Sequence, residues 1–180
     1  RPSAPPSQGA DSTTHDDVSP TGSEGAEGVE GAEGADIPAD PPRPLHPVDV
    51  GLTEADREHL AATLAGLAHD GVDVNHLDAL SAAYDRASQA WWALPERRRR
   101  SESSPVHRFA VGIGEYLARH TDLKWTRVSD SLGVDLGLMA ARDGFAVIPA
   151  NLVTARFLNR ETGWIPGVVG HIVRVRSDSW

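Results

Sequence analysis

The chain has 180 residues, a formal net charge of −9 and no cysteine, which excludes disulfides, thiolate metal sites and cysteine nucleophiles. Its first 50 residues hold ten acidic and two basic side chains, whereas the rest of the chain holds 16 acidic and 15 basic ones. A nearly neutral domain gives no electrostatic reason to expect nucleic acid or a membrane as partner, and no apolar run approaches the ~20 residues that span a bilayer.

Residues 1–51 are predicted to form a disordered acidic tail, and residues 52–180 a single globular domain. The tail is rich in Gly, Pro, Ser and Ala, and its aliphatic side chains are too sparse to repay the entropy of ordering. Five triplets that begin with glycine and end with an acid run from Gly22 to Asp36. They have the spacing of collagen but lack proline, so a flexible, self-repelling spacer is the favoured interpretation.

Two amphipathic helices are expected at the start of the domain. Thr53 and Asp56 stand in the relation of an N-cap and the third helical residue, which predicts that the first helix begins at Thr53. Gly71 is suited to closing that helix, because glycine accepts the left-handed conformation found after helix ends. Asn75 is the expected cap of the second helix, and Pro95 ends it.

A third helix is predicted from Pro105, with one apolar side that continues to Leu117. Gly112 and Gly114 lie inside this helix, where each costs ~1 kcal/mol relative to alanine. Small residues at such positions predict that another element packs closely against them.

The apolar period then becomes alternating, which predicts strands. We expect strands over residues 124–130, 134–140 and 145–148, with an Asp143-Gly144 hairpin turn before the last and Pro149 at its end. These strands form a small three-stranded antiparallel meander.

The C-terminal part is predicted to return to helix. Asn151–Leu158 has a helical pattern, and Thr162 is suited to capping a last helix. The alternation from Val173 to Arg176 leaves an edge strand open as an alternative. The predicted fold class is α+β, with three N-terminal helices, the meander and one or two C-terminal helices.

Several short motifs follow one another in the second half of the chain, namely Gly114–Leu117, Leu123–Trp125, Asp130, Gly133–Leu136, Val147–Pro149 and Arg156-Phe157. Their order resembles a bacterial family known only as a domain of unknown function. The resemblance covers about residues 75–175, leaves the acidic tail outside and implies a small single domain without a known catalytic residue.

Three carboxylates are the candidate catalytic residues, namely Glu115, Asp130 and Asp135. If two of them converge between the third helix and the hairpin, they are suited to acid–base chemistry or to a hard cation. The alternative is structural, since Asp130 is suited to binding turn amides and Glu115 to pairing with Arg119 one helical turn away.

Other catalytic patterns are missing from the sequence. No two of the eight histidines have the i,i+4 spacing of a helical metal site, and no Gly-x-Ser-x-Gly elbow occurs. Gly112-x-Gly114 lies within a predicted helix and not after a strand, which argues against a dinucleotide site. The sequence therefore predicts no metal and no cofactor.

A candidate binding patch consists of Trp92 and the run Arg97, Arg98, Arg99 and Arg100. An exposed tryptophan beside arginines is a typical anchor for a partner. Three alternatives are open: the arginines solvate the helix end and favour its dipole, they attract the acidic tail, or the closing helices cover Trp92.

These observations favour a non-enzymatic protein-interaction module in the cytoplasm, carried on a flexible acidic tether, with an unidentified protein partner and no membrane partner. A small enzyme that uses Glu115 with Asp130 or Asp135 is the first alternative. Weak nucleic-acid binding through Arg97–Arg100 is the second and is not favoured, because Glu96 and Glu102 flank the run.

Overall fold

The computed structural model describes residues 46–131 and 133–177. All of them belong to the compact unit Asp40–Trp180, and the other unit, Arg1–Ala39, lies outside the described residues. The disorder predicted for residues 1–51 therefore falls almost entirely on residues that the structure does not describe.

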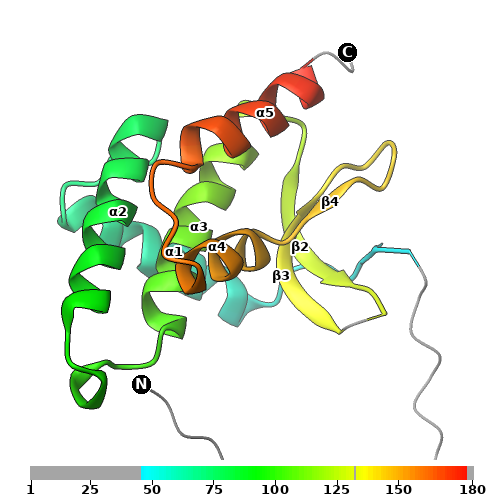
Figure 1. Cartoon of the computed structure of the whole chain (residues 1–180). Helices are drawn as coiled ribbons and strands as arrows, with labels where there is room; N and C mark the ends of the chain where they lie inside the picture. The colour runs from blue at the N-terminus through cyan, green and yellow to red at the C-terminus, as the bar shows by residue number, and fades with distance from the viewer. Residues whose placement is uncertain (1–45, 132, 178–180) are drawn as a thin grey trace, which may run out of the picture. The chain divides into compact units, whose positions relative to one another are not determined.

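Helices and an antiparallel sheet divide the described unit between them (Figure 1), which confirms the α+β class. The counts differ from the prediction, since the described residues form five α-helices, one 3₁₀ helix and four strands. The helices are α1 (Glu54–His69), α2 (Leu77–Ala93), the 3₁₀ helix η1 (Glu96–Arg98), α3 (Ser103–His120), α4 (Pro149–Leu158) and α5 (Ile165–Ser177), and the strands are β1 (Val48–Asp49), β2 (Lys124–Ser129), β3 (Val134–Met139) and β4 (Ala146–Val147).

The sheet has the order β1-β2-β3-β4, with every neighbouring pair antiparallel. Its centre is the hairpin of β2 and β3, in which Lys124 lies opposite Met139 and Ser129 opposite Val134. The unpredicted strand is β1, which pairs with β2 ahead of the predicted start of the domain. A strand of two residues is too short to show an alternating pattern, so only its partner strand reveals it.

The first helix begins as predicted, because Thr53 and Asp56 form a reciprocal capping box. The Asp56 amide donates to Thr53 Oγ1 at 3.2 Å, and the Thr53 amide donates to Asp56 Oδ2 at 2.9 Å. The predicted cap of α2 is wrong, since His76 occupies that position. Asn75 is engaged elsewhere, because its side chain donates to Asp73 and accepts from Arg119.

The C-terminal part is helical where the sequence left a strand open. Residues 173–176 lie within α5, and Arg176 shares a helical face with Val169 and Val173 at spacings of three and four residues. The predicted third strand ends before Pro149, as β4 does at Val147, and Pro149 is also the first residue of α4, as its fixed φ and missing N–H allow.

The two glycines of α3 mark the places where other elements approach it, as predicted. A Cβ on Gly112 would lie 3.0 Å from Leu80 Cδ1, and a Cβ on Gly114 would overlap the Trp125 ring and lie 3.2 Å from Leu138 Cδ1. Gly112 therefore allows the close approach of α2, and Gly114 allows that of the sheet.

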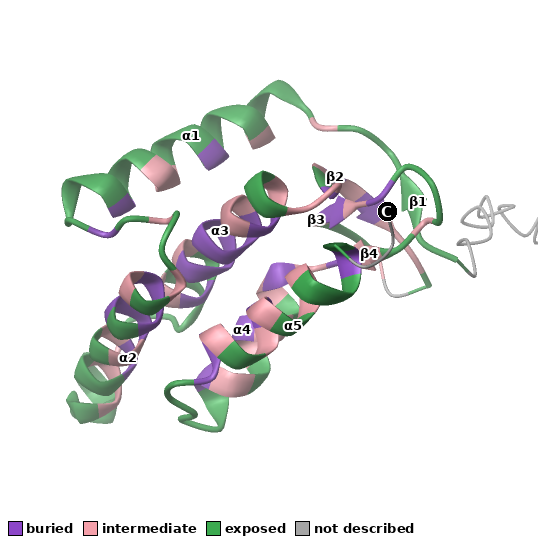
Figure 2. Cartoon of the chain, turned by 90° about the horizontal axis from the view of Figure 1, so that it is seen from above, coloured by how far each residue is buried: buried purple, intermediate pink, exposed green. Residues whose placement is uncertain are grey.

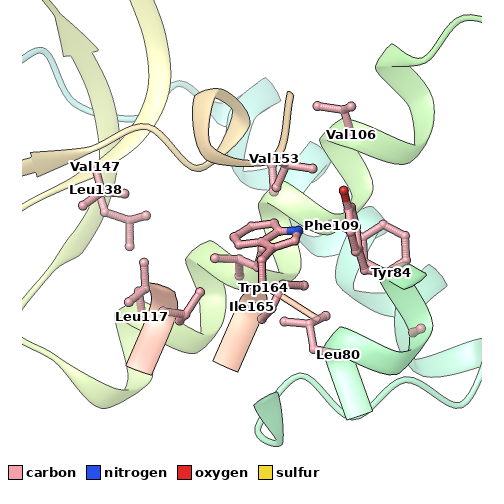
Figure 3. Close-up of a cluster of buried hydrophobic side chains, with 14 of the residues drawn as sticks. Leu80, Tyr84, Val106, Phe109, Leu117, Leu138, Val147, Val153, Trp164 and Ile165 are labelled. Carbon is pink, nitrogen blue, oxygen red and sulfur yellow. The ribbon is translucent and has the colours of Figure 1, made fainter. Parts of the chain in front are cut away.

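α3 is the central element of the hydrophobic core, and Figure 2 shows buried residues along most of its length. Side chains from α2, α3, α4, α5 and the strands meet around it (Figure 3). Tyr84 on α2 packs edge-on against both Phe109 and Trp164, with ring centroids 5.5 and 5.6 Å apart. This core fixes the relative positions of α2 and α3, on which the candidate site depends.

Candidate functional site

Arg99 is the one member of the arginine run that turns inward over the end of α2. Its Nε donates to the Leu94 carbonyl and its Nη2 to the Trp92 carbonyl, each at 3.0 Å. Its guanidinium carbon also lies 4.9 Å from the centroid of the Trp92 ring. A cation on the last carbonyls of a helix stabilises the helix dipole, so Arg99 has the structural role that the sequence left open.

Trp92 is half-buried and is fastened to the end of α4. Its indole Nε1 donates to the Phe157 carbonyl at 3.0 Å, and Arg160 lies over its ring at 4.2 Å from the centroid. This arrangement favours the alternative in which the C-terminal helices cover Trp92. A side chain held in this way is poorly placed to act as the anchor for a partner.

Trp91 faces a groove between α2 and α3 instead. Its Nε1 donates to the Arg100 carbonyl at 3.0 Å, and its ring lies edge-on to Phe157 at 5.2 Å. The hydrogen bond ties the connection between the helices back onto α2. It therefore fixes the backbone position from which the Arg100 side chain extends.

We call this hollow the arginine groove. It has a volume of about 500 Å³ and lies between the end of α1, α2 and the beginning of α3. Apolar side chains form one part of its lining and charged or hydroxyl groups the other. The apolar residues are Val72, Ala83, Ala87, Trp91, Pro105 and Phe109, and the polar ones are Asp70, Arg86, Arg100, Ser101, Ser104 and Arg108.

The polar lining carries an excess of positive charge, since three guanidinium groups and one carboxylate leave a net charge of +2. Arg108 donates to the Asp70 carboxylate and to the Gly66 carbonyl. The hydrogen bond from Arg108 and its positive charge hold the pKa of Asp70 below its ordinary value. Arg86 and Arg100 have no ion pair with any described residue.

A second hollow adjoins the arginine groove at Ser104 and Arg108, which line both. It measures about 320 Å³, runs between α1 and α3, and is also lined by His59 and His107. The two histidines face a small cavity of about 80 Å³ on their other side, together with Asp135. The hollows together follow the first two or so turns of α3, from Ser104 to Val111.

The three candidate catalytic carboxylates, Glu115, Asp130 and Asp135, lie in different local environments. Glu115 accepts from Arg119 Nε at 2.8 Å, which is the predicted pair, and from Trp125 Nε1 at 3.1 Å. Asp130 accepts from the Gly133 amide at 3.1 Å in the turn between β2 and β3, as expected of an aspartate in a turn. Asp130 and Asp135 line different hollows, and Glu115 lines neither of them.

Of the three arginines that line the arginine groove, the sequence pointed only to Arg100. Arg86 and Arg108 were not predicted as site residues. Of the predicted run only Arg100 lines the groove, while Arg97 and Arg98 are exposed outside it. A usable signal lay in α2, where Arg86 shares a helical face with the small residues Ala83 and Ala87. Small side chains beside an arginine leave room for a ligand.

Two further findings limit what kinds of site the described residues form. In residues 46–131 and 133–177, no three His, Asp or Glu side chains are placed to hold a metal ion. Within the same ranges, every helix is too short or too polar to cross a membrane.

Comparisons with models of protein families, with curated proteins and with solved structures found no match to this chain. The resemblance to a bacterial family therefore stays a prediction. Among the described residues, the arginine groove is the feature that points to a function.

Proposed function

We propose that this domain is a non-enzymatic protein-interaction module that binds an acidic segment of a partner protein in the arginine groove. The supporting observation is the net charge of +2 on the groove lining. It stands out against residues 51–180, whose 16 acidic and 15 basic side chains nearly cancel. A local positive hollow on a neutral domain attracts anionic groups and orients them.

The groove is better suited to a peptide than a flat charged surface would be, because its lining combines guanidinium groups with apolar side chains. Guanidinium groups bind carboxylates through two parallel hydrogen bonds, which gives direction as well as attraction. The apolar side of the groove, which includes Trp91 and Phe109, offers contact area for the neighbouring side chains of the same segment. Acidic and apolar residues in alternation are therefore the expected pattern in the partner.

The test is a titration of the full chain with a short labelled Glu-rich peptide, followed by fluorescence anisotropy at low salt. The Glu-rich peptide is expected to bind, and a peptide with Gln in place of every Glu is not. Arg86→Glu and Arg100→Glu are expected to weaken binding about tenfold or more, since each replaces an attraction with a repulsion.

Arg97→Glu is the matched control, because it makes the same charge change on an exposed arginine outside the groove. Its effect on affinity is expected to stay within about threefold, since Arg97 does not line the groove and makes no direct contact with a ligand bound there. Equal losses in the Arg86, Arg97 and Arg100 variants would show general charge attraction and overturn the groove. Tighter binding of a single-stranded oligonucleotide than of the peptide would assign the groove to nucleic acid.

A further inference from the structure

The net charge of the groove lining indicates which type of acidic group the groove binds. Building on the proposed function, we infer that the group recognised is a phosphorylated serine or threonine side chain of the partner. A carboxylate carries one negative charge, whereas a phosphate monoester carries about −1.5 to −2 at neutral pH. A single phosphate monoester therefore matches the net charge of +2 on the groove lining, which otherwise takes two carboxylates to match.

The origin of the three arginines also suits a phosphate group. Arg86 comes from α2, Arg100 from the connection between the helices, and Arg108 from α3, so three separate segments supply the arginines of one groove. A phosphate monoester presents three oxygens arranged around phosphorus, and each can accept from a different donor. A planar carboxylate has only two oxygens, and one guanidinium can bind both of them through two parallel hydrogen bonds.

Part of this lining is held in position before any ligand arrives. Arg108 is fixed by Asp70 and by the Gly66 carbonyl, and the backbone of Arg100 is fixed by Trp91 Nε1. Groups that are already ordered lose less conformational entropy on binding, which raises affinity without adding contacts. Arg86 and Arg100 retain guanidinium groups with no ion-pair partner among the described residues.

The beginning of α3 contributes side chains rather than backbone amides. The Ser103 amide donates to Ser101 Oγ at 3.2 Å, and the Ser104 amide donates to the Ser101 carbonyl at 3.4 Å. Those amides are already satisfied, so the helix end is not the anion site. Recognition depends on the arginines, with the hydroxyl groups of Ser101 and Ser104 at the edge of the same groove.

The experiment compares three peptide libraries with identical randomised flanks and a fixed central Ser, phosphoserine or Glu. Each library is titrated against the full chain by anisotropy. The phosphoserine library is expected to bind about tenfold or more tightly than the Glu library, because its extra charge and third oxygen engage a further arginine. The Ser library is expected not to bind, and inorganic phosphate should displace the phosphoserine library.

The outcomes separate this inference from the proposed function. If the Glu library binds as tightly as the phosphoserine library, the phosphate inference is wrong and the acidic-peptide module stands. If neither binds, both are wrong. If inorganic phosphate binds alone but the phosphopeptides do not, the groove holds a free phosphorylated small molecule and the peptide inference is overturned.

Arginine-to-lysine variants test the geometry without changing the charge. Arg86→Lys and Arg100→Lys keep the positive charge but lose the planar fork of donors. They are expected to reduce the preference for phosphoserine over Glu several-fold, whereas Arg97→Lys should leave the preference unchanged. An unchanged preference in both groove variants would overturn the role of the guanidinium groups.

Discussion

Arg176 is a charged residue that is buried near the end of α5. Its side chain is only 6% exposed, although it carries a full charge. Nε and Nη2 bind the Asp122 carboxylate at 2.9 and 2.5 Å, and Nη1 binds Asp143 at 2.7 Å. A buried charge is tolerated when its partners surround it, so this network allows α5 to turn Arg176 inward.

Removing that charge is expected to destabilise the domain. Arg176→Met keeps much of the volume but leaves Asp122 and Asp143 without their partner, and it should lower the free energy of unfolding by about 2 kcal/mol. Urea unfolding at neutral pH measures the loss. Arg174→Met is the matched control on the exposed side of α5, with an expected change within about 0.5 kcal/mol.

The pH dependence of this difference follows from the carboxylates. The hydrogen bond from Arg176 holds the pKa of Asp122 below its ordinary value. A carboxyl whose pKa is lower in the folded than in the unfolded chain stabilises the fold above about pH 4. That stabilisation is lost as the pH falls through the folded pKa, so the difference between wild type and Arg176→Met should shrink below about pH 4. A difference that stays constant in acid would contradict the ion network.

The sequence predicted the arginine run as one patch and gave no separate role to any of its four arginines. Arg99 caps a helix, Arg100 lines the groove, and Arg97 and Arg98 point to solvent. The difference depends on the turn of η1 and on Trp91, which binds the Arg100 carbonyl. Neighbouring positions in a repeated sequence are distinguished only by such tertiary contacts.

At the scale of elements, α3 is held by close approach on two sides. α2 packs at Gly112 and the hairpin packs at Gly114, where the Trp125 ring occupies the space that a side chain would need. Trp125 is in turn fixed by its hydrogen bond to Glu115 on α3. The helix and the sheet therefore interlock at Gly114.

Gly114→Ala is expected to destabilise the domain by about 1–3 kcal/mol, because overpacking outweighs the better helix propensity of alanine. Thermal and urea unfolding measure the change. Gly66→Ala is the matched control in α1, where a Cβ meets nothing within 4 Å. The control should be neutral or stabilise the domain by up to about 1 kcal/mol. A neutral Gly114→Ala would show that the sheet does not pack on α3 as described.

The elements that local signals specify are the ones that the sequence predicted. The capping box at Thr53 and Asp56 and the small residues of α3 have causes that lie within a few residues of one another. β1 and the end of α5 have causes far away in the chain. β1 exists because β2 pairs with it, and α5 continues through Arg176 because Asp122 and Asp143 meet it there.

At the scale of the whole described unit, stability is expected to be uneven. α3 buries eight of its 18 residues, whereas α1 buries only two of 16, Leu60 and Leu67. Figure 2 shows α1 with mostly exposed residues along its length. A helix with few buried contacts opens locally at a lower free-energy cost than the core.

Hydrogen exchange followed by mass spectrometry should therefore show α1 exchanging well before α3. Sub-global opening of α1 leaves the remaining core intact, so its amides exchange without complete unfolding. Peptides from α4 provide an internal comparison, because Val153 and Phe157 are fully buried. Equal protection of α1 and α3 would mean that the unit opens only as a whole.

All of the residues that line the arginine groove lie between Asp70 and Phe109 in the chain. The sheet, α4 and α5 support this stretch from behind but contribute no lining residue. The stretch from Asp70 to Phe109 therefore supplies both the groove and, through α2 and α3, part of the hydrophobic core. Substitutions of Arg86 or Arg100, which are exposed, can change the ligand preference without touching the core, whereas substitutions of Ala83 or Phe109 change both.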